Sequence, residues 1–517
     1  MSFCTVLSAA VQGLSVEMIR VEADVSNGLP MFHMVGYLSS EVKEASERVR
    51  TAIRNSGMKL PAKKIIVNLA PATVRKRGAS FDLPIALAVL AAMNYVPEEA
   101  LKGVAVIGEV SLEGKIRGVS GVLPIVMEAK NQGCTACILP EENEIEGRLV
   151  SEIKILPADN LEKLCAYLNG DEKEIHRKKQ GRSSAQRNIF ENKKEDFSDI
   201  CGQNAVKRAA EIAVAGGHNL LMAGPPGSGK SMIARRIATI LPELSLEESL
   251  EITRIYSVLG MIDKEQPLIT RRPFRSVHHT ITKTALVGGG MTPRPGEISM
   301  AHGGVLFLDE LAEFPRNVLE VLRQPLEEHQ IHIARNYGNF TFPAEFMLVA
   351  AMNPCPCGNY PDMQKCSCTP SQIQKYLGKI SQPFLDRMDL CIETPKVEYR
   401  ELDIERIGKK EEESSEVIRS RVVEARKLQK KRYEGTQIRT NSMLGPGEIR
   451  TYIPLGSAER KLMEKAFERM GLTARTYHKI LRVARTIADL DYSEKVTEKH
   501  LKEAIAYRSL DKKYWGR

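Results

Sequence analysis

The sequence has no apolar stretch long enough to span a membrane. Its longest apolar run, residues 83–93, contains Pro84 and is far shorter than the roughly 20 residues of a membrane-spanning helix. The first residues, Met-Ser-Phe-Cys-Thr, lack the positively charged segment that opens a signal peptide. We therefore expect a cytoplasmic protein without a membrane partner.

Aromatic residues are also scarce, at 5% of the chain, and the single tryptophan is Trp515, near the end. No aromatic ladder that could stack on nucleic-acid bases is visible. Charge is not strongly one-sided either, because 74 lysines and arginines face 65 aspartates and glutamates, for a net charge of +9. This mild excess allows a nucleic-acid partner without establishing one.

Disulfides are not expected, because the ten cysteines occur without a secretion signal. Four of them form two close pairs, Cys355-Pro-Cys357 and Cys366-Ser-Cys368. Four thiols so near one another predict a structural, tetrahedral Zn²⁺ site, in which four thiolates leave no open coordination position. Free thiols in a loop and an iron–sulfur cluster are the alternatives.

What the sequence does contain is a complete phosphate-binding loop, or P-loop, which follows an apolar run at residues 220–223. Its glycines would let backbone N–H groups cradle phosphates at the start of a helix. Lys230 would reach the β- and γ-phosphates, and Ser231 would hold Mg²⁺. We therefore predict binding of a nucleoside triphosphate. The loop consists of Gly224, Pro225, Pro226, Gly227, Ser228, Gly229, Lys230 and Ser231.

Two later apolar runs end in residues that could complete nucleotide hydrolysis. The run at 305–308 is followed by Asp309 and Glu310; Asp309 would hold Mg²⁺ through its waters, and Glu310 would polarise the attacking water as general base. The alternative is an ordinary junction between a strand and a turn. The run at 347–352 ends at Asn353, whose amide could orient the water, although an asparagine before Pro354 is also a common strand-ending turn.

With 517 residues, the chain is too long for a single hydrophobic core. We predict α/β folds for a domain at residues 1–170 and for a core at 198–395, with the four cysteines in an insert at 355–368. The polar segment 171–197 is predicted to be a linker; a solvated helix and a nucleic-acid-binding strap are the alternatives. Residues 396–517 are predicted to be helical.

The predicted helical region contains a basic segment. It is either the solvated face of a helix or a contact with DNA, in which case binding should weaken steeply with salt. Its cations are Arg419, Arg421, Arg426, Lys427, Lys430, Lys431 and Arg432.

In this order, the P-loop, the Asp-Glu pair and the asparagine resemble the AAA+ ATPases. The resemblance implies that the nucleotide is ATP and that Asn353 is the residue called sensor 1. The segment 385–389 is similar to the one that carries their arginine finger, which implies that Arg387 acts on the γ-phosphate bound by a neighbouring subunit. The alternative is an internal ion pair of Arg387 with Asp386 or Asp389.

Arg475 stands in the first turn of a predicted helix, after Thr473 as its N-cap. A cation there opposes the helix dipole, which indicates an anionic partner. The position matches sensor 2 of the AAA+ ATPases, which reads the γ-phosphate from a helical lid. Arg482 and Arg485, farther along the same helix, are expected at the surface.

Other segments narrow the resemblance. Residues 272–299 resemble the helix-2 insert of the magnesium-chelatase and MCM branch, and His278 and His279 in it are expected to be structural or to face a pore rather than to bind a metal. The segments 353–358, 295–302 and 27–30 look like those of the ComM/YifB family of magnesium-chelatase-like AAA+ proteins, over nearly the whole chain.

This resemblance implies a homo-oligomeric ring, expected to be a hexamer, that uses ATP to drive branch migration of DNA. Branched or single-stranded DNA would be its substrate, in recombination or natural transformation. A chelatase-like machine that remodels proteins and an inactive regulatory ring are the alternatives.

The N-terminal domain is similar to the proteolytic domain of Lon, which uses a Ser–Lys dyad. Residues 77–80 resemble the segment around its nucleophile, which would be Ser80, and residues 108–112 resemble a following strand. The position expected to carry the base is Leu123. A serine without a base is a poor nucleophile, so we expect a Lon-like domain without peptidase activity.

Overall fold

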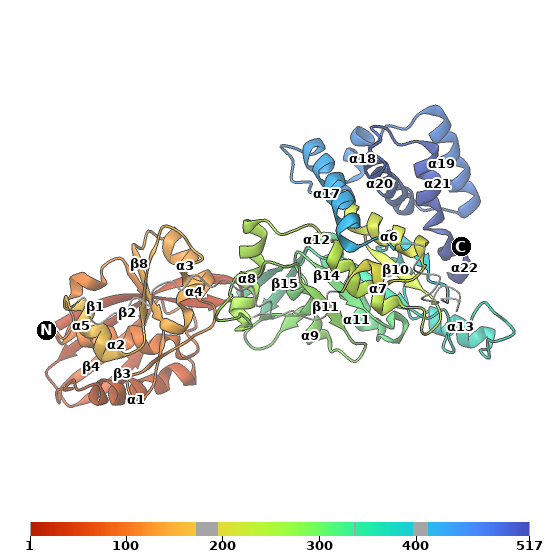
Figure 1. The fold of residues 1–517 in the computed structure, drawn as a ribbon. Helices are drawn as coiled ribbons and strands as arrows, with labels where there is room; N and C mark the ends of the chain where they lie inside the picture. The colour runs from red at the N-terminus through yellow and green to blue at the C-terminus, as the bar shows by residue number, and fades with distance from the viewer. Residues whose placement is uncertain (1, 172–194, 336–337, 397–411, 516–517) are drawn as a thin grey trace.

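The structure, a computed structural model, describes residues 2–171, 195–335, 338–396 and 412–515. Nearly all of the predicted linker at 171–197 therefore lies outside the described residues. The described chain is mixed α/β, as predicted, with an N-terminal α/β body, a second α/β body and a group of C-terminal helices (Figure 1). Within these residues, no helix combines the length and the apolar character needed to cross a membrane.

The N-terminal body is built on a seven-stranded mixed sheet in the order β3-β4-β2-β1-β5-β8-β9. A helix of mostly apolar residues, α2 (Asp82–Ala92), is buried at every position because it packs against the sheet on one side and α1 (Ser40–Asn55) on the other. The strands are β1 (Ser2–Gln12), β2 (Ser15–Ser26), β3 (Met31–Val35), β4 (Lys64–Ala70), β5 (Val104–Val106), β8 (Ala136–Pro140) and β9 (Lys154–Ala158). The remaining helices are α3 (Val122–Asn131), α4 (Glu144–Gly147) and α5 (Leu161–Leu168), and a small hairpin joins β6 (Glu109–Val110) to β7 (Ile116–Arg117).

The second body holds a five-stranded parallel sheet in the order β11-β14-β17-β10-β18. The side chains of its three central strands are all buried, which is why the sequence shows continuous apolar runs there. The strands are β10 (Leu220–Ala223), β11 (Phe274–Val277), β14 (Val305–Leu308), β17 (Met347–Met352) and β18 (Leu390–Glu393). The main helices are α6 (Asn204–Gly216), α7 (Lys230–Ile237), α8 (Leu246–Leu259) and α13 (Pro370–Leu377).

Short elements fill the connections of this body. The segment that resembles a helix-2 insert contains α9 (Lys283–Val287), β12 (Gly288–Gly289), β13 (Arg294–Pro295) and α10 (Glu297–Met300); its identification as that insert stays a prediction. After β14 come α11 (Arg316–Glu320), α12 (Pro325–Glu328) and a hairpin of β15 (Gln330–Arg335) and β16 (Gly338–Pro343), and α14 (Gln382–Leu385) precedes β18.

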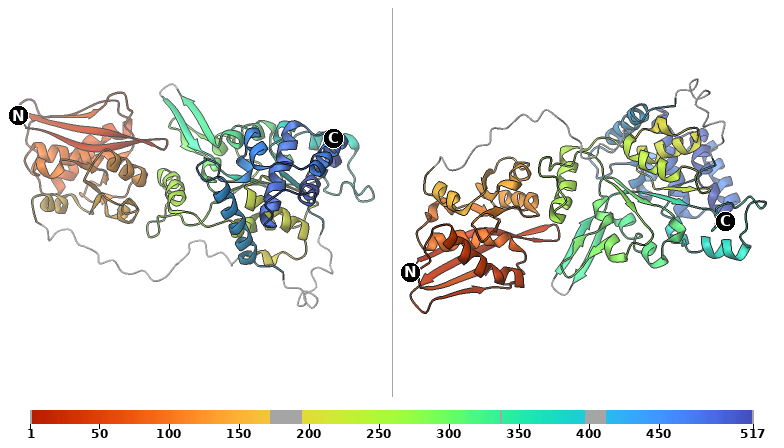
Figure 2. Two further views of the ribbon diagram at one scale, coloured as in Figure 1. Left: turned by 90° about the horizontal axis from the view of Figure 1, so that it is seen from above. Right: turned by 60° about the horizontal axis from the view of Figure 1, so that its bottom comes forward.

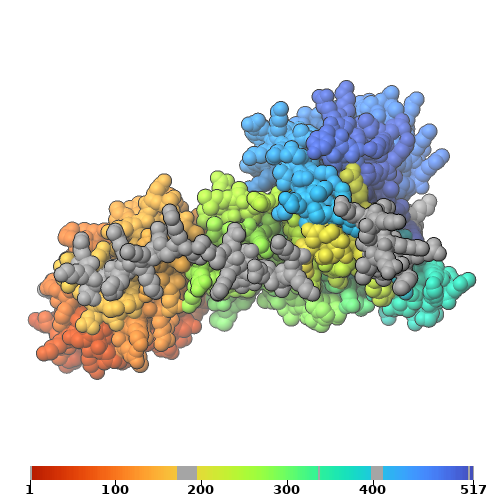
Figure 3. All heavy atoms as spheres, in the orientation of Figure 1, coloured from red at the N-terminus to blue at the C-terminus, as the bar shows by residue number. Residues whose placement is uncertain are grey.

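The two α/β bodies meet at α8 (Figures 1 and 3). The Gly121 amide donates to the Ser257 carbonyl of α8 at 2.9 Å, and the Ser257 hydroxyl donates to the Glu146 carboxylate at 2.6 Å. Glu146 also accepts from the Leu123 amide at 2.9 Å. Leu123, at the position expected for the base of a Ser–Lys dyad, is thus an apolar residue buried beside this junction.

A second contact joins the same two bodies. The hairpin of β15 and β16 extends beside the hairpin of β1 and β2 (Figure 2). Gly13, in the turn between β1 and β2, lies so close to Phe340 and Phe342 that a Cβ atom there would be 3.0 Å and 3.3 Å from their rings. The N-terminal body therefore contacts the second body through two separate elements.

The C-terminal helices share one hydrophobic core with the P-loop sheet. Helices α17 and α20 both pack on α6, which immediately precedes β10. The helices are α17 (Ser415–Arg432), α18 (Pro446–Tyr452), α19 (Ser457–Met470), α20 (Ala474–Leu490), α21 (Glu498–Ala506) and α22 (Ser509–Trp515). The predicted helical character of this region is confirmed for its described residues.

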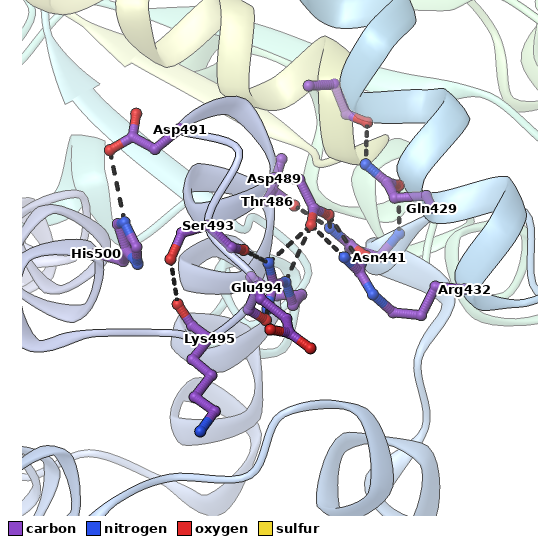
Figure 4. Close-up of polar contacts among 12 residues, drawn as sticks. Gln429, Arg432, Asn441, Thr486, Asp489, Asp491, Ser493, Glu494, Lys495 and His500 are labelled. Carbon is purple, nitrogen blue, oxygen red and sulfur yellow. Dashed lines mark hydrogen bonds and ion pairs between the residues drawn. The ribbon is translucent and has the colours of Figure 1, made fainter.

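A buried polar network joins α17 to α20 (Figure 4). Asp489 has no exposed surface and accepts hydrogen bonds from three side chains, those of Arg432 (3.0 Å), Asn441 (2.8 Å) and Arg485 (3.1 Å). The expectation that Arg485 lies at the surface is wrong, because its charge is compensated inside the protein. Arg482 is also not a free surface residue, since it is half-buried and donates to a backbone carbonyl at 3.0 Å.

The basic segment is not a uniform solvated face. In α17, Arg421 pairs with Glu211 at 2.5 Å, Arg426 donates to the Val214 carbonyl at 2.8 Å, and Arg432 belongs to the network around Asp489. These three arginines hold α17 against the core. The exposed cations of the helix are the lysines Lys427, Lys430 and Lys431.

Candidate nucleotide-binding site

The P-loop joins β10 to α7, which confirms the predicted order of strand, loop and helix. Gly227 and Gly229 have φ angles of 75° and 83°, which residues with a side chain rarely adopt. Gly224 is confined for a different reason, because a Cβ atom there would lie 2.2 Å from the Thr394 carbonyl oxygen. The loop conformation therefore requires glycine at each of these positions.

Lys230 is folded into this loop. Its Nζ donates to the carbonyls of Gly224 and Pro225, both at 2.8 Å, and to Asn353 Oδ1 at 3.3 Å. Burial lowers the pKa of Lys230 to about 8, and nearby Asp309 opposes that shift. The structure thus brings Asn353, at the end of β17, to the side chain that would contact the phosphates.

Ser231 and Asp309, the two predicted Mg²⁺ ligands, also lie together. The Ser231 hydroxyl donates to Asp309 Oδ2 at 2.6 Å. A hydroxyl and a carboxylate are the oxygen ligands that Mg²⁺ prefers, so this donor set fits the ion.

Glu310 is held in an unusual position. Its φ of 53° and ψ of 47° lie in the left-handed region, which costs a residue with a side chain about 1–3 kcal/mol and is concentrated at functional sites. Its carboxylate is about half exposed and lies 3.2 Å from His279 Nδ1. The backbone at Glu310 therefore directs the carboxylate away from the strand and toward His279.

The sequence does not predict the contact between His279 and Glu310, because both histidines are expected to be structural or to face a pore. One nitrogen of His278, one of His279 and an oxygen of Glu310 lie within 4.8 Å of one another. The sequence feature that indicates this contact is the position of His279 just after β11. Strands β11 and β14 are parallel neighbours, so their carboxyl ends lie at the same edge of the sheet.

The four predicted zinc ligands are clustered. The Sγ atom of Cys355 lies 3.4 Å from that of Cys357 and 3.8 Å from that of Cys366, Cys357 and Cys366 are 3.6 Å apart, and Cys368 completes a group within 4.8 Å. A tetrahedral site with Zn–S bonds of about 2.3 Å has S–S edges of about 3.8 Å. The sulfur geometry therefore fits Zn²⁺.

Arg387 does not form either of the internal pairs considered from the sequence. Asp386 accepts a hydrogen bond from Gln382, and Asp389 pairs with Lys479 at 2.9 Å. Arg387 instead donates to the carboxylate of Glu327, at the end of α12. No local pattern signals this partner, which lies 60 positions earlier in the chain.

Arg475 is exposed in the first turn of α20. Thr473 is the N-cap of this helix, as predicted, since its Oγ1 accepts from the Thr476 amide at 3.2 Å. Burial lowers the pKa of Arg387, and the charges of Arg323 and Arg475 add to that shift. Among the described contacts, neither side chain bonds to the P-loop of its own chain.

Three family models match the sequence. The model described as magnesium chelatase, subunit ChlI, matches residues 196–402, which include the P-loop and all the candidate site residues except Arg475. The model for subunit ChlI of Mg-chelatase matches residues 21–143, and the one for the C-terminal part of this subunit matches residues 412–508.

Individual proteins are similar over the full length. The uncharacterized protein YifB of Escherichia coli is 44% identical over 512 residues, and the competence protein ComM of Haemophilus influenzae is 42% identical over 517 residues. Each alignment covers 99% of this chain and 98% of the relative. A Lon protease of Trichlorobacter lovleyi is 26% identical over 160 residues, which are 29% of this chain and 19% of that protease.

Proposed function

The chain belongs to the ComM/YifB family of magnesium-chelatase-like AAA+ proteins, and on that basis we propose that it is an ATP-driven, ring-forming motor that acts on DNA. The observation that carries the ATPase part is the convergence of Lys230, Ser231, Asp309 and Asn353 at one edge of the parallel sheet. These residues come from three strand ends, and together they offer the phosphate contacts and magnesium ligands that hydrolysis requires.

Each residue has a role in this proposal. The P-loop and Lys230 bind the phosphates of ATP, and Ser231 and Asp309 hold Mg²⁺. Glu310 takes the proton of the attacking water, which Asn353 orients. The left-handed backbone at Glu310 supports this role, because it leaves the carboxylate half exposed at the edge where the nucleotide would lie.

Arg387 acts on the nucleotide bound by a neighbouring subunit, which makes the active site depend on a ring, and Arg475 reads the γ-phosphate from the helical lid. Among the described contacts, Arg387 makes no bond to the P-loop of its own chain, which supports its action between subunits. Arg387 must then exchange Glu327 for the phosphate when the ring forms. We propose a hexamer.

The remaining parts carry roles of the same kind. Residues 1–170 form a Lon-like domain without peptidase activity, because Leu123 cannot serve as a base. Residues 171–197 link it to the core at 198–395, and the helices of 396–517 form a lid. The cysteines at 355–368 hold Zn²⁺ as a structural ion, and the motor works in the cytoplasm.

DNA is proposed as the substrate because the relative ComM is named a competence protein. Lys430 and Lys431 on the exposed side of α17 are proposed to contact DNA phosphates, whereas Lys427 pairs with Glu424 at 2.8 Å. Branch migration of forked or four-way DNA during recombination or natural transformation is the finer proposal. The alternative, a machine that remodels proteins, is favoured by the chelatase-subunit models that match the chain.

ATP turnover measured with and without DNA separates these two functions. We expect forked or four-way DNA to stimulate the full-length protein at low salt and to stimulate it much less at high salt, because phosphate contacts release counterions. Lys230→Ala is the control that should abolish turnover under every condition. If no DNA, single-stranded or branched, stimulates turnover at either salt concentration, the proposed DNA motor is wrong.

A further inference from the structure

The four-cysteine loop, residues 355–368, packs directly against the P-loop. Gly358 is buried and has a φ of 80°, and a Cβ atom there would lie 2.3 Å from Pro226 Cδ and 2.8 Å from Pro226 Cγ. Pro226 is the third residue of the P-loop and is otherwise exposed. The backbone of Gly358 therefore packs directly against Pro226 of the P-loop.

The position of Gly358 is set by the cysteines. Its amide donates to the Cys355 carbonyl at 3.0 Å, and Cys357 directly precedes it in the chain. The Tyr360 amide donates to the Cys355 sulfur at 3.4 Å. Gly358 is thus the last residue of a turn that contains two members of the sulfur cluster, Cys355 and Cys357.

The same turn is connected to the other side of the nucleotide site. Asn353, which accepts a hydrogen bond from Lys230 at 3.3 Å, is separated from Cys355 only by Pro354. A shift of Cys355 would therefore move both Gly358, which packs against the P-loop, and the Asn353 amide.

Apolar packing fixes the start of the loop but not its middle. Cys355 is buried in a hydrophobic cluster, and Tyr360 packs against that cluster with its ring centroid 6.1 Å from that of Tyr514. Residues 361–365, which join the two cysteine pairs, are all exposed, and so are the residues on either side of Cys368. The exposed middle of the loop therefore depends on the metal to hold the two cysteine pairs together, because the binding energy of the metal is then its folding energy.

We propose that a metal ion bound by the four cysteines supports the P-loop through the contact of Gly358 with Pro226, so that nucleotide affinity depends on the loaded cysteine site. This inference rests on the proposed zinc and ATP sites and adds a coupling between them. Without the ion, the turn becomes more mobile and Pro226 loses its contact with Gly358. The P-loop then occupies its binding conformation for a smaller fraction of the time. If one backbone residue becomes free, affinity should fall about five- to thirtyfold.

The test measures two quantities on the full chain: bound zinc by elemental analysis, and the Kd of a fluorescent ATP analogue with Mg²⁺ in excess. Removing zinc with a chelator should weaken binding of the analogue by about five- to thirtyfold, and adding Zn²⁺ back should restore the affinity. Circular dichroism before and after removal shows whether the rest of the chain stays folded.

Two variants separate the contact from a general effect. The Gly358→Ala variant should keep its zinc and still bind the analogue more weakly, because the alanine Cβ collides with the Pro226 ring. Gly435→Ala is the matched control: Gly435 has nearly the same φ, 79°, but no atom within 4 Å of its Cβ position. It imposes the same backbone strain and should leave the Kd unchanged.

The outcomes are distinct. A wild-type protein that binds the analogue equally well with and without zinc overturns the coupling, as does a chain that holds no zinc, and the proposed ATPase stands in both cases. A Gly358→Ala variant with unchanged Kd also overturns it. A wild-type protein that binds no analogue in any state refutes the proposed ATPase itself.

Discussion

His218 connects the P-loop strand to the C-terminal helices and should make the stability of this junction depend on pH. It is fully buried just before β10, with Nε2 2.8 Å from the Thr486 hydroxyl of α20 and Nδ1 4.0 Å from the Asp389 carboxylate. Thr486 in turn belongs to the polar network around Asp489 (Figure 4). Burial lowers the pKa of His218 to about 4, although Asp389 favours the charged form.

The size of the pH effect on stability follows from the difference between this pKa and the value of about 6.5 for an unfolded histidine. Because the folded protein keeps His218 neutral, the unfolded chain binds the proton first as the pH falls. The contribution of His218 to stability is therefore complete above about pH 6.5 and is lost as the pH falls toward 4. At pH 5 the loss should be about 2 kcal/mol.

Urea unfolding at pH 8 and pH 5 measures this loss. The single tryptophan, Trp515, is a suitable probe, because its Nε1 donates to the Leu377 carbonyl at 3.3 Å and it therefore reports on the packing of α22 against the core. The comparison is with His218→Gln, which can still bond to Thr486 but does not titrate. The fall in the free energy of unfolding between the two pH values should be about 2 kcal/mol smaller in the variant. Equal falls in both proteins would refute the reasoning, since every other histidine is present in both.

Three further predictions concern the site and its support. Glu310→Gln should bind ATP and assemble but not turn it over, in assays of analogue binding and phosphate release; normal hydrolysis would show that Glu310 is not the base. Arg387→Ala and Lys230→Ala should each be inactive, and mixing the two proteins should restore some turnover if Arg387 acts between subunits; a mixture without any activity would count against that action. Asp489→Asn should lower the free energy of unfolding by about 3 kcal/mol, because two guanidinium groups lose their buried counter-charge. Glu424→Gln, on the exposed side of α17, should change it by less than about 0.5 kcal/mol, and similar effects of the two changes would argue against the network.

Much of this fold and site could be predicted because both depend on short patterns in the chain. Apolar runs predicted β10, β14 and β17, and the residues after each run predicted which strand ends carry chemistry. Parallel strands place their carboxyl ends at the same edge of a sheet. The sequence motifs by themselves therefore determined that Lys230, Asp309 and Asn353 would meet, and they also determined the family.

Only the tertiary structure decided the contacts that connect this site to the rest of the protein. They include His279 with Glu310, Gly358 with Pro226 and Arg387 with Glu327. Each contact joins residues far apart in sequence, and no periodicity encodes which of several nearby charges a side chain meets. The arginines of α17 show the same limit, because a cation on an amphipathic helix has the same local sequence whether it faces water or a buried carboxylate. Burial makes that choice, and burial exists only once the chain has packed.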